Sequence, residues 1–150
     1  MDKSLYEQDF FRWTEEQARA LRAAASQRLN APLDWENLAE EIESLGRSDR
    51  RQLASRVQTV IEHLMKLQLS PAEAPRRGWE ATIVRERQII RALLDESPSL
   101  RGTVAELVAK AVPAARDVVE TELAQHREAG RKLVSLTYTE EQVLGAWLPG

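Results

Sequence analysis

The amino-acid sequence predicts an all-α protein, a single-domain antiparallel (up-and-down) helical bundle of about four main helices with a short C-terminal helix. Five strong helix formers, alanine, leucine, glutamate, arginine and lysine, make up 78 of the 150 residues. Valine and isoleucine together number only 15 and are scattered, which argues against an extensive sheet. Because this length is that of one ordinary domain, residues 1–150 are predicted to form a single helical-bundle domain.

The first long helix is expected from Phe11 to Leu29, where apolar residues recur at helical spacing. Inside this run, Thr14 begins the sequence TEEQ, which is typical of a capping box and predicts a fresh helix start. The same sequence returns at Thr139 and predicts a short helix from about Glu140 to Ala146. The apolar residues of the closing sequence WLP are expected to pack against the bundle.

A second helix is expected to begin after Asp34, which is a good N-cap residue. Its apolar face carries Trp35, Leu38, Ala39, Ile42 and Leu45. A further apolar seam follows at Leu53, Val57, Val60, Ile61, Leu64 and Leu67. A continuous helix over both seams would be about 52 Å long, whereas a globule of this size has a diameter of roughly 38 Å. The sequence therefore predicts a break or bend near Gly46, with Ser48 as the cap of the next helix.

Two prolines and a glycine make residues 70–78 the clearest loop in the chain. The helix after this loop is marked by Trp79, Ile83, Ile90 and Leu94 and is expected to end at residues 95–96. Ser97 and Pro98 form a typical helix start. The seam of the last long helix is expected at Leu100, Val104, Leu107, Ala111, Ala114 and Val118. Pro113 predicts a kink in this helix or its division into two pieces, and Gly130 is expected to end the pattern.

Composition excludes several classes of function. The chain has no cysteine, which rules out disulfides, thiolate nucleophiles, zinc ribbons and iron–sulfur clusters within one chain. The first residues are charged, and no segment approaches the roughly 20 apolar residues of a membrane span, so a cytoplasmic protein without membrane contact is expected. No cofactor-binding motif stands out, and no cofactor is predicted.

Residues 34–53, which read DWENLAEEIESLGRSDRRQL, resemble the signature of a bacterial family known as domain of unknown function 29. Shorter segments resemble the pattern of that family in the same order: YEQDF from Tyr6, HLMK from His63, SPSL from Ser97, YT from Tyr138 and LP from Leu148. The resemblance covers nearly the whole chain and implies an all-helical bundle. Because the family has no accepted activity, the resemblance implies no catalytic residue.

Charged residues gather in two adjacent blocks, one before and one after Gly46. The acidic block consists of Asp34, Glu36, Glu40, Glu41 and Glu43, and the basic block of Arg47, Arg50, Arg51 and Arg56. Glu43 and Arg47 stand four residues apart, a spacing at which opposite charges pair on a helix. The candidate interaction surface drawn from these blocks comprises Trp35, Glu36, Glu40, Glu43, Arg47, Arg50 and Arg51. The simpler alternative is a solvated acidic face that the arginines neutralise.

The sequence favours a small non-catalytic binding or regulatory module that associates with an unknown protein partner or with itself. An alternative is an enzyme or a metal- or ligand-binding protein that uses a carboxylate–arginine cleft, with Glu36, Glu40 and Arg50 as the first residues to test. A second alternative is nucleic-acid contact through arginine patches, which also include Arg76 and Arg77. The isoelectric point near 5.5 argues against nucleic acid as a partner.

Histidine supplies no clear site. Paired metal sites in helical bundles use Glu-x-x-His, and neither His63 nor His126 has a glutamate three residues earlier. No metal site is therefore predicted. His63 is expected to be a satisfied, partly buried side chain rather than a general base, because no nucleophile is placed beside it by any motif.

Overall fold

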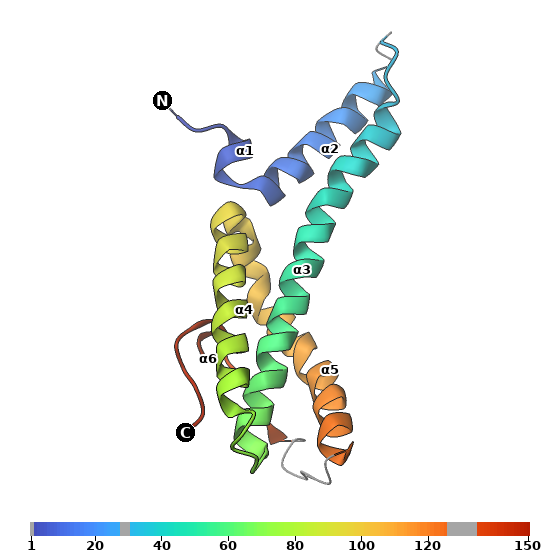
Figure 1. Ribbon diagram of the computed structural model, residues 1–150. Helices are drawn as coiled ribbons and strands as arrows, with labels where there is room; N and C mark the ends of the chain where they lie inside the picture. Colours follow the sequence, from blue (N-terminus) through green and yellow to red (C-terminus); the bar gives the residue numbers. More distant parts are fainter. Residues whose placement is uncertain (1, 28–30, 126–134) are drawn as a thin grey trace. The chain divides into compact units, whose positions relative to one another are not determined.

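The computed structural model describes residues 2–27, 31–125 and 135–150 (Figure 1). The helices in chain order are α1 (Leu5–Gln8), α2 (Phe10–Ser26), α3 (Trp35–Leu69), α4 (Arg76–Glu96), the 3₁₀ helix η1 (Pro98–Thr103), α5 (Val104–Gln125) and α6 (Glu140–Leu144). These described ranges contain no β-strand. The predicted all-α fold, with four main helices and a short C-terminal helix, is confirmed. Leu29 and Gly130, the two expected helix ends, lie outside the described residues.

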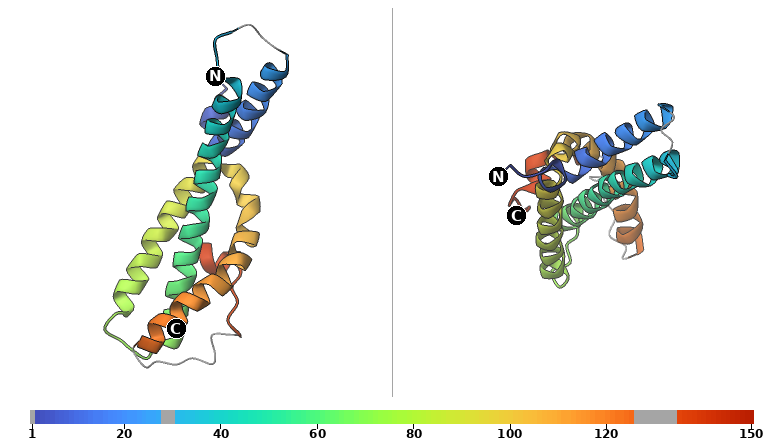
Figure 2. Two further views of the ribbon diagram at one scale, coloured as in Figure 1. Left: turned by 90° about the vertical axis from the view of Figure 1, so that its right-hand side faces the viewer. Right: turned by 90° about the horizontal axis from the view of Figure 1, so that it is seen from above.

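Contacts within the chain divide it into two compact units. Unit 1 comprises Met1–Gln52 and Leu93–Arg101, and unit 2 comprises Leu53–Ala92 and Gly102–Gly150. In unit 1, α2 runs antiparallel beside the first half of α3 (Figures 1 and 2). In unit 2, α4 runs antiparallel beside the second half of α3. The single-domain organisation of the chain stays a prediction.

The start of α2 is set by Asp9 and not by Thr14. The Asp9 carboxylate accepts a hydrogen bond from the Arg12 N–H at 3.0 Å and so caps the helix. The predicted start at Thr14 is wrong, because the residues before it are already helical and leave no free helix end for TEEQ to cap. Thr14 is fully buried, and its hydroxyl donates to the Phe11 carbonyl at 2.6 Å.

The second TEEQ sequence caps a helix as predicted. At the start of α6, the Thr139 hydroxyl accepts from the Gln142 N–H at 3.2 Å. The Gln142 side chain in turn accepts from the Thr139 N–H at 3.0 Å. The same four residues therefore act differently at the two positions, because only the second stretch follows a non-helical segment.

Helix α3 is continuous over 35 residues. Its predicted start is confirmed, since Asp34 Oδ1 accepts from the Asn37 N–H at 3.3 Å. The predicted break near Gly46 and the cap at Ser48 are wrong. A Cβ atom at Gly46 would fall well inside van der Waals contact with the Thr14 Oγ1, so the glycine permits close packing of α2 on α3. Helix α3 contributes residues to both units, so the diameter of a single globule does not limit its length.

The two apolar seams of α3 have different fates. All six residues predicted for the second seam are buried, each at most 3% exposed. They form the core of unit 2 with Ile83 and Ile90 of α4 and with the buried face of α5. On the first seam, Ala39 is buried, whereas Leu38 and Leu45 are 40% and 51% exposed. The expectation that this whole seam is a core face is therefore wrong, because α2 packs on the side of α3 that carries Gly46.

Helix α4 begins at Arg76, so the predicted loop ends three residues earlier than expected. The Pro75 carbonyl accepts from the Trp79 N–H at 3.1 Å, and proline is well suited to a helix start. The predicted end of α4 at residues 95–96 is confirmed. Pro98 starts a 3₁₀ helix, and α5 follows from Val104.

Helix α5 runs through Pro113 without interruption, so the predicted division into two pieces is wrong. The alternative prediction, a kink, agrees with the change of direction midway along α5 (Figure 2). The predicted seam residues Ala114 and Val118 are exposed, whereas Ala115 and Val119 are buried. The predicted seam was therefore one residue early after Ala111, and the buried stripe keeps its helical spacing on both sides of the proline.

The C-terminal segment is held by a buried arginine. Arg87 of α4 donates hydrogen bonds to the carbonyls of Val143 at 2.9 Å, Gln142 at 2.8 Å and Trp147 at 2.7 Å. Burial lowers the pKa of Arg87 and raises that of Tyr138, whose hydroxyl donates to the Gln68 side chain. Across the described residues, we find no helix with the length and hydropathy needed to cross a membrane.

Candidate functional site

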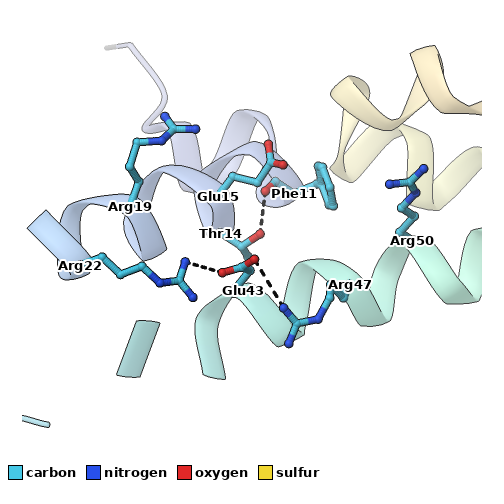
Figure 3. A pocket seen from close by; sticks show the side chains of 8 residues that line it. All are labelled: Phe11, Thr14, Glu15, Arg19, Arg22, Glu43, Arg47 and Arg50. Carbon is cyan, nitrogen blue, oxygen red and sulfur yellow. Dashed lines mark hydrogen bonds and ion pairs between the residues drawn. The ribbon is translucent and has the colours of Figure 1, made fainter. Parts of the chain in front are cut away.

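An open pocket of about 350 Å³ lies between α2 and the first half of α3, entirely within unit 1 (Figure 3). Helix α2 contributes Phe11, Thr14, Glu15, Arg19 and Arg22, and helix α3 contributes Glu43, Arg47 and Arg50. Four arginines face two glutamates, which leaves a surplus of two positive charges on the lining. The charged blocks of the sequence are thus part of a concave surface.

Glu43 lies between an arginine of each helix (Figure 3). Its carboxylate pairs with Arg22 of α2 at 2.5 Å and with Arg47 of α3 at 3.5 Å. The predicted pairing of Glu43 with Arg47 at i and i+4 is confirmed. Glu40 forms a second bridge at the edge of the pocket, 2.6 Å from Arg47 and 3.6 Å from Arg22. These pairs cross-link the two helices and hold both guanidinium groups at the pocket.

The ion pairs of this network remain accessible to solvent. The side chains of Arg22 and Glu43 are 42% and 36% exposed. The hydrogen bond to Glu43, together with the charges of Glu43, Glu40 and Glu36, raises the pKa of Arg22. Because water screens such pairs, each contributes little to stability. The network orients the guanidinium groups without committing them strongly to the two carboxylates.

Close packing of the helices sets the floor of the pocket. Gly46 brings the backbone of α3 against Thr14, and the ring of Phe11 lies beside the same glycine. Thr14 is the single hydroxyl-bearing residue of the lining, and its hydroxyl is engaged by the Phe11 carbonyl. The floor therefore offers neither a nucleophile nor a general base.

A polar clamp fixes the N-terminal end of α2. The Asp9 carboxylate accepts from both the N–H and the hydroxyl of Ser99, each at 2.8 Å. The Ser97 hydroxyl accepts from the Phe11 N–H at 3.0 Å, which satisfies another free donor of the first turn. These bonds tie α2 to residues 97–99 and so position one wall of the pocket.

The structure brings together only part of the predicted interaction surface. Glu43, Arg47 and Arg50 line the pocket, and Glu40 lies at its edge. The remaining three predicted residues, Trp35, Glu36 and Arg51, do not line it. Of the acidic block, Glu40 and Glu43 pair with arginines, and one of these arginines, Arg22, comes from α2.

Sequence reasoning missed Arg19 and Arg22. They stand three residues apart and share a face of α2. An antiparallel pairing of α2 with the acidic block of α3 would have placed them correctly. Gly46 opposite Thr14 sets that pairing, and the misassignment of Gly46 as a helix end concealed it.

The second arginine patch, in unit 2, is exposed at Arg77, whereas other arginines of this unit are used in internal bonds. Arg76 donates to the Leu67 carbonyl at 2.8 Å, and Arg87 is buried. Arg56 of the first basic block also belongs to unit 2 and pairs with the buried Glu86 at 3.0 Å.

His63 is half-buried, and its Nδ1 donates to the Thr59 carbonyl at 2.8 Å, as expected for a satisfied histidine. In the described part of the chain, no cluster of three or more His, Cys, Asp or Glu side chains is arranged to hold a metal.

The fold and the pocket define an all-helical protein with a cationic surface site. The chain belongs to the family described as domain of unknown function DUF29, whose family model matches residues 5–148. A crystal structure of an alpha-helical protein of unknown function from Rhodospirillum rubrum ATCC 11170 is similar, with a TM-score of 0.76 and 27% sequence identity. The match covers 97% of this chain and 92% of that one. A search of curated proteins found no match.

Proposed function

We propose that the protein is a non-catalytic binding module whose arginine-lined pocket takes a small anionic ligand with a phosphate or carboxylate group. The observation that carries this proposal is the convergence of Arg19, Arg22, Arg47 and Arg50 from two helices on one concavity. Guanidinium groups present planar, paired donors that match the oxygens of carboxylates and phosphates. The volume of about 350 Å³ lies within the range of small-molecule sites.

The internal carboxylates support binding rather than prevent it. Glu43 and Glu40 hold the guanidinium groups of Arg22 and Arg47 in place, which lowers the side-chain entropy lost when a ligand binds. Exchange of an exposed ion pair for a ligand contact costs little, since water already screens the pair. Arg19 also lines the pocket and offers a further guanidinium group.

Calorimetric titration with inorganic pyrophosphate at low salt tests the proposal. The wild-type protein is expected to bind one equivalent, with an affinity that falls as salt rises. The double variant Arg19→Gln/Arg22→Gln is expected to weaken binding by at least about tenfold, which corresponds to roughly 1.4 kcal/mol. Arg12→Gln is the matched control, because Arg12 is an exposed arginine of α2 that pairs with Glu16 and does not line the pocket. Equal binding by the double variant and the control would refute the proposal.

Binding is favoured over catalysis because the lining contains no histidine, lysine or cysteine, its one hydroxyl is engaged, and the Glu43 carboxylate is held between Arg22 and Arg47. It is also favoured over nucleic-acid contact, because three of the arginines outside the pocket, Arg56, Arg76 and Arg87, are used in internal bonds. A gel shift of duplex or single-stranded DNA at low salt, lost in Arg47→Gln/Arg51→Gln, would instead favour nucleic acid. A cytoplasmic location is part of the proposal, and cell fractionation tests it.

Self-association is a second candidate function. Leu38 and Leu45, seven residues apart, form an exposed apolar stripe on α3 with the half-buried Ile42 between them. This spacing is the one that paired helices use, and a second copy of the chain would offer the same stripe. Sedimentation equilibrium of the wild type and of Leu38→Gln/Leu45→Gln tests this candidate. A wild-type protein that stays monomeric at the highest concentration would exclude it.

A further inference from the structure

A second pocket, of about 330 Å³, lies within unit 2 at the C-terminal end of α3. It is lined by Lys66, Ser70, Ala72, Pro75, Trp79, Glu122 and Leu123. Most of these residues are apolar or small, in contrast to the arginine-lined pocket of unit 1. The polar and aromatic groups of the lining are one cation, one carboxylate, one indole ring and the Ser70 hydroxyl, which accepts from the Ala72 N–H at 3.2 Å.

Lys66 is the unusual member of this lining. It is only 9% exposed and stands on α3 directly between Met65 and Leu67, which are core residues. Its Nζ lies 2.5 Å from a carboxylate oxygen of Glu122 on α5 and 6.0 Å from the centre of the Trp79 ring on α4. The indole face and the carboxylate thus both compensate the ammonium group for its loss of water.

Stability alone gives little reason to keep this lysine. An ion pair with a buried partner gains back only part of the desolvation cost, and an apolar pair is often at least as stable. Glu122 is 44% exposed, so its carboxylate can turn into solvent and leave the ammonium group free to receive another anion. Trp79, Pro75 and Leu123 form apolar walls beside that position.

We infer that this pocket binds a small amphipathic carboxylate, a molecule with one carboxylate group on an apolar body. The ligand carboxylate replaces that of Glu122 at the Lys66 ammonium group, and the apolar body lies against the indole of Trp79 and the side chain of Leu123. Such a ligand satisfies both the buried charge and the apolar walls, whereas a multiply charged anion would leave charge against the apolar walls. The inference is independent of the arginine-lined pocket, since the two pockets share no residue.

The test follows the indole N–H signal of Trp79 by NMR while sodium octanoate is added, with the signal assigned through Trp79→Phe. Saturable movement of this signal, with the other three tryptophan signals unmoved, is expected. Octanol, which has the same apolar body without the charge, is expected to bind at least about tenfold more weakly. Equal binding of octanoate and octanol, or a shift without saturation, would overturn the inference.

Three variants identify the groups responsible. Lys66→Met keeps the length and apolar character of the side chain and is expected to abolish the preference for octanoate over octanol. Glu122→Gln is expected to tighten octanoate binding by several fold, because the competing carboxylate is gone. Lys110→Met is the matched control, since Lys110 is an exposed lysine of α5 that pairs with Glu106 outside the pocket. Weaker octanoate binding by Glu122→Gln would contradict the inference, as would an unchanged preference for octanoate over octanol in Lys66→Met. If Lys66→Met fails to fold, the result for Glu122→Gln alone decides.

Discussion

Replacement of Gly46 by alanine tests whether this glycine allows close packing of helices or ends a helix. The added Cβ atom would overlap the Thr14 Oγ1 and lie 3.3 Å from Cδ2 of Phe11. Thr14 cannot give way freely, because it is fully buried and its hydroxyl is bound to the Phe11 carbonyl. Overpacking of this kind costs about 1–3 kcal/mol. Alanine gains about 1 kcal/mol over glycine in a helix interior.

The net expectation for Gly46→Ala is therefore a destabilisation of roughly 0–2 kcal/mol, from the difference of these two effects. Gly78→Ala is the matched control, because Gly78 is also helical and a Cβ atom there meets nothing within 4 Å. The control is expected to gain up to about 1 kcal/mol. Urea unfolding followed by circular dichroism at a helix band measures both changes.

A second background separates the two explanations of Gly46. In a Thr14→Ala chain the overlap with Oγ1 is absent and only the tight contact with Phe11 remains, so Gly46→Ala is expected to destabilise less than in the wild-type background. If Gly46 instead provided a helix-ending conformation, alanine would destabilise equally in both backgrounds. Stabilisation by Gly46→Ala in the wild-type background would also refute the packing argument.

Three further predictions concern polar groups. Asp9→Ala removes the cap of α2 and the carboxylate that accepts two hydrogen bonds from Ser99. The free energy of unfolding in urea is expected to fall by about 2–4 kcal/mol. A change near zero would show that the clamp is dispensable. Burial and the charge of Glu96 raise the pKa of Asp49, so the folded state binds this proton more tightly than the unfolded chain and loses stability as pH rises through the raised value. Asp49→Asn is therefore expected to equal or exceed the wild type in stability at neutral pH, with the difference vanishing below about pH 4, and destabilisation at neutral pH would contradict this. Arg87→Met removes three hydrogen bonds to the C-terminal segment. We expect proteolysis within that segment to become faster, while α3 to α5 stay protected from hydrogen exchange.

Periodicity was sufficient to predict the helices and much of the core. The second seam of α3 is buried at every predicted position. The spacing of apolar residues along a helix indicates which side of it is buried. The bend at Pro113 and the cap at Thr139 also follow from local chemistry that depends on few neighbours. These features can be predicted from a single sequence.

Other features depended on contacts between segments distant in sequence. The role of Gly46 depends on its contact with Thr14, which lies 32 positions earlier. The rules that predict helix ends use only neighbouring residues and do not include such a contact. The pocket combines arginines of α2 with the charged blocks of α3, so only three of its eight lining residues could be located from the blocks alone. Lys66 was absent from every predicted site because its acid partner is on α5 and its aromatic partner is on α4.

The central claim is that the arginine-lined pocket of unit 1 receives an anion. The most direct measurement is a pyrophosphate titration of ¹⁵N-labelled protein, followed at the guanidinium Nε–H signals of individual arginines. The signals of Arg22 and Arg47 are expected to move along one saturable curve, while those of Arg12 and Arg101, which pair with carboxylates outside the pocket, stay in place. No movement of the first two signals, or equal movement of all four, would contradict the claim.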